Sequence, residues 1–207
     1  MTPLTTGGEN EGAPMVLISR NLADAHISLY PAAFATNEAD ALFRELLGGV
    51  EWRQETINLF GRHVRIPRLT AWYGDAPYSY SGLTMQPEPW TAQLLAIKVR
   101  AEQLSGHRFN GVLLNRYRTG RDSMSWHSDD EPELGSNPAI ASVSFGALRR
   151  FRLRHRTRKE EKFAIDLSHG SLLVMDRATQ HHWQHSVSKT AKPVGERINL
   201  TFRLIRA

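Results

Sequence analysis

The sequence predicts an α+β domain that is mainly β. Two helical patterns occupy the first half of the chain, whereas short runs rich in Val, Ile, Leu and Phe, separated by turn residues, fill the half that starts at Gly111. Helices followed by many short strands are typical of an α+β domain whose larger part is a β-sandwich or barrel. The 207 residues, 41% hydrophobic and 23% charged, are ordinary for one soluble domain with a sizeable core.

The N-terminal half is predicted to hold a tail and two helices. Residues 1–14 show no apolar periodicity and are expected to form a flexible tail. A helix is expected to begin near Asn37, where a capping residue precedes apolar residues at helical spacing, and to stop at Gly48 and Gly49. The segment Trp90–Leu104 carries a second apolar stripe, which Gly106 closes.

Strands are predicted before and after the second helix. Residues 51–69 indicate two strands joined by a tight connection around Phe60 and Gly61. Six later runs have the length and composition of strands: GVLLNRY at 111–117, AIASVSFG at 139–146, RFRLRHR at 150–156, KFAIDL at 162–167, GSLLVMD at 170–176 and RINLTFRLI at 197–205. Since neither a linker nor an internal repeat divides these segments, residues 15–207 are predicted to form one domain.

Composition excludes several kinds of site. The chain has no cysteine, which rules out disulfides, thiolate zinc sites and a cysteine nucleophile, so a metal would be bound by His, Asp or Glu. The first residues lack the pattern of a signal peptide, and no run of about 18 apolar residues occurs. We therefore expect a soluble monomer without membrane contact, cytoplasmic in a bacterium or nuclear in a eukaryote.

The charge distribution favours an anionic partner. The net charge is +5, and residues 149–162 contain eight Lys or Arg against two acids, which makes a local basic patch. Arg150, Arg152, Arg154 and Arg156 alternate along one predicted strand and would share one face of it. That face is suited to phosphates, although a strand face that is simply solvated has the same pattern.

The last predicted strand separates an apolar face from a polar one. Alternation in RINLTFR places Ile198, Leu200 and Phe202 on one side, and Arg197, Asn199, Thr201 and Arg203 on the other. The polar side is either a solvated face or a site for a small dicarboxylate, because the planar guanidinium group pairs with carboxylate at two points. Asn115 and Tyr117 project from one face of GVLLNRY and offer neutral hydrogen-bonding groups.

A histidine and a carboxylate in WHSDD could hold a metal. His127 and Asp129 are separated by one residue, and QHHWQHS adds His181, His182 and His185. Two imidazoles and one carboxylate leave three positions of an octahedral ion open, as in non-haem Fe(II) oxygenases. Zinc hydrolysis could use similar ligands, and a polar loop with surface histidines is the simpler alternative.

In this order along the chain, the motifs NRY, WHSDDE, IASVSFG, HGSLLVM, HHWQHSV and RINLTFR resemble the AlkB-type Fe(II)/2-oxoglutarate dioxygenases, which repair alkylated nucleic acids. The resemblance extends from Trp52 to Arg206. It implies a double-stranded β-helix (jelly-roll) core over about 111–207, preceded over about 15–110 by an N-terminal extension with helices and a β-hairpin lid that recognises the nucleotide.

The same resemblance implies the cofactors and the reaction. Fe(II) would be bound by His127, Asp129 and His185, and 2-oxoglutarate by five residues: Asn115, Tyr117, Arg197, Asn199 and Arg203. With O2, the enzyme would form succinate and carbon dioxide, hydroxylate a methyl group on a base nitrogen, and release formaldehyde. The implied substrates are 1-methyladenine and 3-methylcytosine in single- or double-stranded DNA.

The resemblance also implies contacts with the substrate, each with a structural alternative. Phe60 would be a wedge that enters the base stack, or an ordinary hairpin aromatic. Tyr80 would stack on the damaged base, with Tyr73 and Tyr78 as rivals, and Glu131 would accept a hydrogen bond from an exocyclic amine. Arg150 and Arg152 would contact phosphates. Trp126 and the run Asp176–Ala178 depart from the family pattern, which leaves the preferred lesion open.

Two other functions remain as alternatives. A hydroxylase or demethylase of RNA or protein would use the same chemistry on another partner. A non-catalytic nucleic-acid-binding jelly roll would keep the basic strand without taking up iron.

Overall fold

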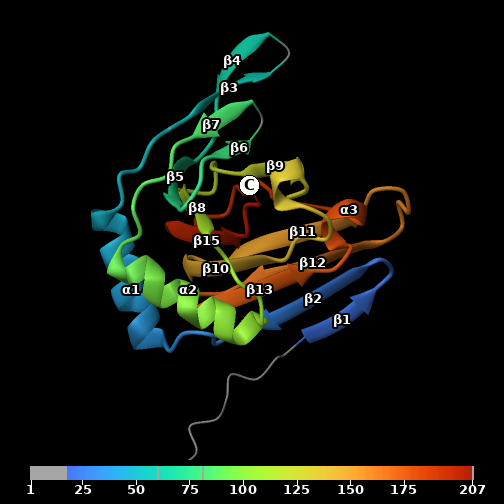
Figure 1. Cartoon of the computed structure of the whole chain (residues 1–207), viewed down its shortest axis with the longest axis horizontal. Coiled ribbons are helices and arrows are strands. Elements are labelled where there is room, and N and C mark those ends of the chain that lie inside the picture. Colours follow the sequence, from blue (N-terminus) through green and yellow to red (C-terminus); the bar gives the residue numbers. More distant parts are fainter. Residues whose placement is uncertain (1–17, 60, 81, 207) are drawn as a thin grey trace, which may run out of the picture.

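The structure, a computed structural model, describes residues 18–59, 61–80 and 82–206. The predicted tail at 1–14 therefore lies outside the described residues. Within them, two antiparallel sheets form a jelly roll, with helices on one side and two hairpins at one end (Figure 1). The mainly β fold predicted from the sequence is confirmed. No helix in these ranges is both long and apolar enough to cross a membrane.

The major sheet contains strands from both halves of the chain. Its order is β1 (Ile18–Leu22), β2 (Ala25–Tyr30), β13 (Ser171–Asp176), β10 (Ile140–Gly146), β15 (Arg197–Arg203), β8 (Gly111–Tyr117) and β5 (Leu69–Gly74). The sequence did not predict β1, β2 or β5. Because these three strands extend the sheet on both sides of the central strands, the expected division near residue 110 is no boundary in the fold.

The minor sheet lies across the interior from the major sheet. Its order is β12 (Lys162–Leu167), β11 (Arg149–His155), β14 (Trp183–Val187) and β9 (Met124–His127). The strand β9 falls in the polar segment that alternation could not identify, and β14 follows the short helix α3 (Thr179–His182). A single 3₁₀ turn, η1 (Pro132–Leu134), follows β9.

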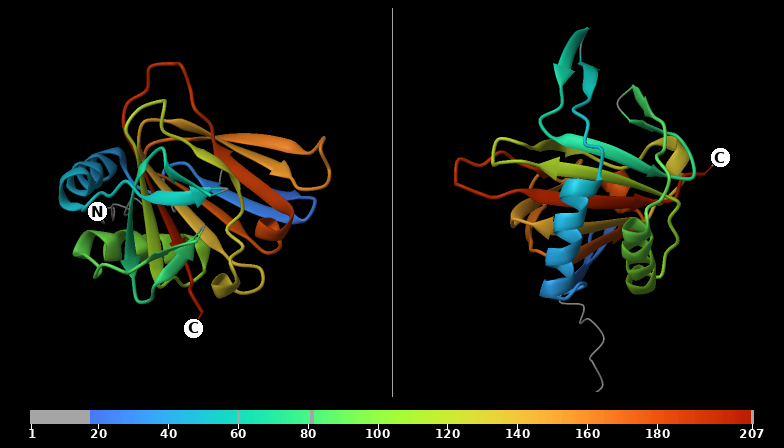
Figure 2. Two further views of the ribbon diagram at one scale, coloured as in Figure 1. Left: turned by 90° about the horizontal axis from the view of Figure 1, so that it is seen from above. Right: turned by 90° about the vertical axis from the view of Figure 1, so that its left-hand side faces the viewer.

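Two helices cover the outer face of the major sheet. These are α1 (Thr36–Gly49) and α2 (Ala92–Ser105), and both stand on the same side in Figures 1 and 2. Their buried residues Leu46 and Ile97 share one apolar cluster with the outward face of β15, which includes Leu200. As predicted, α2 ends at Gly106, whose φ of 73° closes the helix. The helix α1 ends at Gly49, also as predicted.

A second apolar cluster fills the space between the sheets. Leu113 and Leu173 enter it from the major sheet, and Phe151, Leu153 and Trp183 enter it from the minor sheet. Each of these strands therefore places alternate residues in the interior, as the period of two requires.

Two hairpins project beyond the sandwich at one end. They are β3 (Thr56–Leu59) with β4 (Arg62–Arg65), and β6 (Tyr78–Tyr80) with β7 (Leu83–Met85), and the right-hand view of Figure 2 shows both above the sheets. The first is the hairpin predicted from the sequence, and every residue of β4 is exposed. Its predicted wedge, Phe60, lies outside the described residues. The position of the two hairpins at one end of the sandwich fits the predicted lid.

Candidate metal and 2-oxoglutarate site

Three predicted metal ligands converge between the sheets. His127 ends β9 and is the direct partner of His185 on β14, so the two imidazoles lie on one face with ring centroids 4.2 Å apart. Asp129 follows two residues after His127, and its Oδ2 lies 3.5 Å from His185 Nε2. The ligand atoms of all three residues lie within 4.8 Å of one another. The convergence predicted from the sequence is present.

The hydrogen bonding of His127 suits a metal ligand. Its Nδ1 lies 2.9 Å from the carbonyl oxygen of Ser125, to which only a protonated Nδ1 can donate. The lone pair of a neutral ring is then on Nε2. Metal-bound histidines commonly have this arrangement, with one ring nitrogen on the ion and the other N–H on a carbonyl.

Burial keeps the two imidazoles neutral and other charges keep the carboxylate ionised. Burial lowers the pKa of His127, and burial together with repulsion from His127 lowers the pKa of His185 to about 3. Burial by itself would raise the pKa of Asp129, but the Arg203 guanidinium and the two imidazoles outweigh it and the pKa falls below its ordinary range. Neutral imidazole and ionised carboxylate are the forms that bind a metal.

Arg203 connects the major sheet to this ligand set. Its Nη2 donates to Asp129 Oδ1 at 2.6 Å, and both side chains are almost fully buried. The acid beside Arg203 is therefore a predicted ligand rather than an unrelated carboxylate. The Nε of Arg203 has no hydrogen-bond partner among the described residues, so the Arg203 guanidinium can still donate to a bound anion.

Arg197 is a buried cation with unused donors. It is 1% exposed, and its Nη2 donates to Ser144 Oγ at 2.9 Å, while Nε and Nη1 have no partner within the described part of the chain. Burial lowers its pKa to about 10. Unpaired N–H groups on a buried guanidinium are costly unless a ligand binds them, and a carboxylate matches their planar geometry. The residues present therefore fit 2-oxoglutarate.

A cavity joins the ligand set to the polar face of β15. Its polar lining consists of Asn115, Tyr117, His127, Asp129, Ser142, His185, Ser186, Asn199, Thr201 and Arg203. The alternation predicted for β15 is confirmed, but neither face is solvated, because all seven residues are buried. The apolar side lies under the helices, and Asn199, Thr201 and Arg203 of the polar side line the cavity.

Two neutral residues that were predicted to assist in binding 2-oxoglutarate, Tyr117 and Asn199, have different surroundings. Tyr117 lies between two arginines, with Arg197 Cζ 5.2 Å and Arg149 Cζ 5.6 Å from its ring centroid. Asn199 donates to Ser142 Oγ and to the carbonyl oxygen of Val143, both at 2.8 Å. Asn199 thus supports the cavity wall with donors that are already used.

Comparison with known proteins places this geometry in a family. Residues 26–203 match the 2OG-Fe(II) oxygenase superfamily. The chain belongs to this family. Alpha-ketoglutarate-dependent dioxygenase alkB homolog 3 from Homo sapiens is 45% identical over 190 residues, covering 87% of this chain and 66% of that protein. DNA oxidative demethylase ALKBH2 from Mus musculus is 42% identical over 188 residues, covering 85% of this chain and 79% of that protein.

A solved structure supports the fold of this oxygenase. That of OsALKBH1 superposes with a TM-score of 0.64 at 15% identity and covers 86% of this chain and 97% of that one. The oxygenase chain spans 66% of the length of alkB homolog 3 from human and from Bos taurus. The cofactors of this oxygenase family are Fe(II) and 2-oxoglutarate, used with O2, in agreement with the donor set above.

The residues predicted to contact the substrate differ in their burial. Glu131 is half-buried, and burial and the Asp129 charge raise the pKa of its carboxyl. Tyr80 ends β6, but its side chain lies outside the described part. Its rival Tyr78 is fully buried, stacks on Trp72 at 4.8 Å, and lies with its ring centroid 5.1 Å from Arg203 Cζ. Tyr78 therefore contacts the site from below the lid.

The predicted basic face is present on β11. Arg150 and Arg152 are exposed and point away from the core, because Phe151 and Leu153 between them point inward. Arg150 donates to both oxygens of Asp166, at 2.8 and 3.0 Å, so its charge is largely neutralised. Among the described residues, Arg152 has no ion pair.

Sequence reasoning missed two buried residues that hold the site together. Arg68, 2% exposed, donates from Nε to Asn115 Oδ1 at 2.6 Å. Gln180, fully buried, accepts the backbone N–H of Asp129 at 2.9 Å. Arg68 precedes a strand and Gln180 lies in a short helix, so neither belongs to a recognisable periodic pattern.

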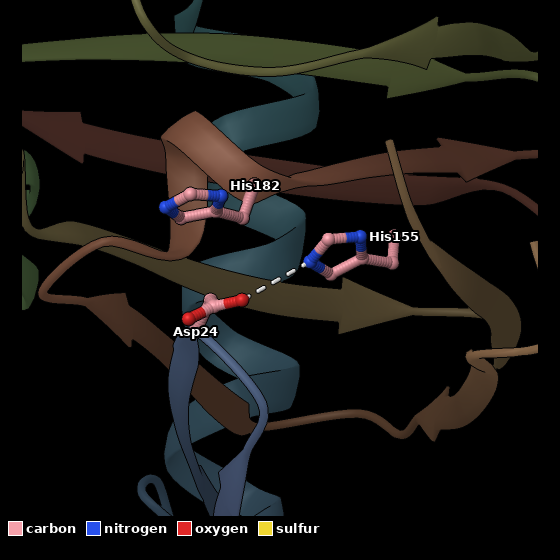
Figure 3. Close-up of side chains that lie close together, drawn as sticks. All are labelled: Asp24, His155 and His182. Atoms are coloured by element: carbon pink, nitrogen blue, oxygen red, sulfur yellow. Dashed lines mark hydrogen bonds and ion pairs between the residues drawn. The ribbon is translucent and has the colours of Figure 1, made fainter. Parts of the chain in front are cut away.

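A second group of metal-binding residue types lies at the β1–β2 turn. Asp24, His155 and His182 have ligand atoms within 4.8 Å of one another (Figure 3). His155 Nδ1 accepts the backbone N–H groups of Thr157 and Arg158, at 3.2 and 3.1 Å. A neutral ring must then carry its proton on Nε2, which lies 3.4 Å from Asp24 Oδ2.

This arrangement opposes metal binding. A protonated Nε2 has no lone pair for an ion, the reverse of the state at His127. Arg158 Nη2 lies 3.1 Å from the same oxygen of Asp24 and adds a positive charge there. We therefore interpret the hydrogen bond between Asp24 and His155 as a structural contact that holds the β1–β2 turn against the minor sheet. His182, one of the two rival ligands in the sequence, belongs to this group rather than to the iron site.

Proposed function

We propose that this protein removes methyl groups from 1-methyladenine and 3-methylcytosine in DNA by oxidative demethylation. The observation that carries the proposal is the cavity in which His127, Asp129 and His185 meet the buried guanidinium group of Arg203. A second buried guanidinium group, that of Arg197, lies against the cavity residue Tyr117, and both groups retain unpaired donors. The names of the two relatives, a 2-oxoglutarate-dependent dioxygenase and a DNA oxidative demethylase, support both the chemistry and the substrate.

The chain's residues would divide the work between binding and exclusion of water. His127, Asp129 and His185 would hold Fe(II), and Arg197 and Arg203 would donate to the carboxylates of 2-oxoglutarate. Leu113 and Phe151, which line the same cavity, reduce access of water to the reacting atoms. When bound, iron supplies the activation of O2 that is coupled to decarboxylation of 2-oxoglutarate.

The products follow from the balance of atoms. One oxygen atom enters succinate, which leaves with carbon dioxide, and the other enters the N-methyl group. The hydroxymethyl group then loses its bond to nitrogen, which yields formaldehyde and the unmodified base. A methyl on the pairing edge is hidden in a duplex, so the nucleotide must be unpaired or turned outward.

A turnover assay tests the proposal. A methylated single-stranded oligonucleotide, Fe(II), ascorbate and 2-oxoglutarate are expected to give formaldehyde and succinate in equal amounts with the wild type and neither with Asp129→Ala. Glu45→Ala, which removes an exposed carboxylate on α1, away from the cavity, is the control and keeps turnover. Intact methyl groups and no succinate with the wild type would refute the proposal.

The same assay separates the alternatives. Preference for methylated RNA over DNA would move the substrate to RNA. Nucleic-acid affinity without iron uptake, unaffected by His127→Ala, would indicate a non-catalytic binding protein. We also propose Phe60 as a wedge, in which case Phe60→Ala lowers turnover on duplex DNA and leaves turnover on single strands unchanged.

A further inference from the structure

The outer face of the minor sheet forms a cationic groove with an aromatic platform. Arg150, Arg152 and Arg154 point outward from β11, Lys162 from β12, and Trp126 reaches the same groove from β9. Alternate residues on a strand lie about 6.8 Å apart, so these arginines form an evenly spaced row. None of the described residues that line this groove is acidic.

The charge of the row is only partly compensated. Arg150 is paired with Asp166 at the edge of the groove. Arg154 donates from Nε and Nη2 to Gln184 Oε1, at 3.0 and 2.8 Å, and this neutral partner leaves its charge intact. Arg152 and Lys162 are exposed, and neither makes an ion pair within the described ranges. The groove therefore attracts a polyanion.

Trp126 and Arg154 lie against each other at one end of the row. The Arg154 guanidinium lies 4.3 Å from the Trp126 ring centroid and is held in place by Gln184. Aromatic rings and guanidinium planes are the surfaces on which unpaired bases stack. Lone phosphates would need no such platform, so its position beside a row of cations indicates a ligand with both bases and phosphates.

The platform begins beside the candidate active site. Trp126 directly precedes the metal ligand His127 on β9, so the two side chains point to opposite faces of the minor sheet. Because β9 is the edge strand of that sheet, a nucleic-acid strand with one nucleotide in the cavity reaches the platform with a neighbouring nucleotide by passing over this edge. We propose that the groove from Trp126 along β11 binds the single-stranded segment that flanks the methylated nucleotide. This inference rests on the proposed function for the identity of the strand.

The physical argument favours a single strand over a duplex. In a duplex the base faces are already stacked on one another, so Trp126 would add nothing and only phosphates could contact the arginines. An acidic peptide would meet the charges but would not depend on the aromatic ring. The contribution of Trp126 therefore distinguishes these occupants.

Binding of an unmethylated oligonucleotide tests the inference without turnover. The full chain, loaded with Fe(II) and 2-oxoglutarate under nitrogen, is titrated into a fluorescein-labelled single strand and into the matching duplex. Trp126→Leu is expected to weaken single-strand binding roughly 5- to 150-fold, and Trp126→Phe to retain it. Arg152→Gln is expected to lower the slope of log affinity against log salt by about 0.7.

The control is Arg44→Gln. Arg44 is exposed on α1, which covers the opposite side of the molecule, and the substitution removes the same charge without changing the salt slope. Three results would overturn the inference: unchanged affinity in Trp126→Leu, an equal loss for the duplex, or an equal slope change in Arg44→Gln. Poly-glutamate is expected to compete with the labelled single strand, and to bind the wild type and Trp126→Leu equally well. Weaker binding of poly-glutamate to Trp126→Leu would contradict the stacking role.

Because this measurement needs no methyl group, its outcome is separate from demethylation. Expected binding without formaldehyde release would refute the proposed function alone, whereas formaldehyde release without the expected binding pattern would refute only the groove.

Discussion

Replacing Arg203 with Met is expected to destabilise the metal-free protein far more than the same change at Arg150. Arg203 Nη2 lies 2.6 Å from Asp129 Oδ1, and Arg150 Nε lies 2.8 Å from Asp166 Oδ1, so both pairs have good geometry. Their surroundings differ. The side chains of the first pair are each 4% exposed, and those of the second are 62% and 43% exposed.

Burial decides the magnitude. Arg203→Met leaves the Asp129 carboxylate in the interior without its guanidinium partner, which costs about 3–5 kcal/mol. Arg150→Met leaves Asp166 in water, where the lost pair is worth about 0.2–1 kcal/mol. In a domain of this size each kcal/mol shifts Tm by about 2–4 °C, so Arg203→Met is expected to lower Tm by about 6–20 °C and Arg150→Met by at most about 4 °C.

Urea and thermal unfolding in the presence of EDTA measure both variants without a contribution from bound metal. A double variant, Asp129→Leu with Arg203→Met, removes both buried charges and is expected to regain much of the lost stability, although the metal site is destroyed. Equal unfolding free energies for Arg203→Met and Arg150→Met would show that the Asp129 carboxylate is well solvated, and the reasoning about the buried pair would be wrong.

Three further predictions concern stability and metal binding. Burial by itself would raise the pKa of Asp122, but hydrogen bonds from the neighbouring Arg118 lower that pKa below its ordinary range. The stability that Asp122 contributes is thus present above about pH 4 and lost as pH falls through the lowered pKa. Asp122→Asn is therefore expected to reduce the change of the unfolding free energy, measured with urea, between roughly pH 5 and 2. Gly146 has a φ of 85°, and a Cβ there would collide with the backbone, so Gly146→Ala is expected to destabilise the protein by more than about 1–2 kcal/mol. Gly48→Ala, in open space on α1, is expected to stabilise it by about 0.5–1 kcal/mol. Thermal unfolding of both variants checks this, and an unchanged Tm for Gly146→Ala would contradict it. Gln180→Leu leaves the backbone N–H of Asp129 unpaired and is expected to weaken Mn(II) binding about 10- to 100-fold in a titration, a result that unchanged affinity would rule out.

Ordered motifs and alternation were sufficient to predict much of the site. The ligand atoms that His127 and Asp129 offer, and the two faces of RINLTFR, are local properties of the sequence. The structure brings His127 and Asp129 together with His185 and confirms the two faces. Alternation could not tell whether the arginine face of β15 meets water. That depends on the minor sheet, which covers it and turns Arg197 into a buried cation with unused donors.

Other features had no local signal. The β1–β2 hairpin joins the major sheet because β2 bonds to the edge of β13. Tyr78 packs against Arg203 because its ring stacks on Trp72. Gln180 reaches Asp129 across a separation in sequence that no periodic pattern records.

By itself, then, the amino-acid order determined which side chains share a face and which chemical groups are available, since a period of two or 3.6 acts over a few neighbouring residues. Only the tertiary structure decided which faces meet. The pairing of β14 with β9 sets His185 opposite His127, whereas His182 lies in α3, before β14 begins. A shift of this pairing by one residue would turn the His185 side chain to the other face of the sheet.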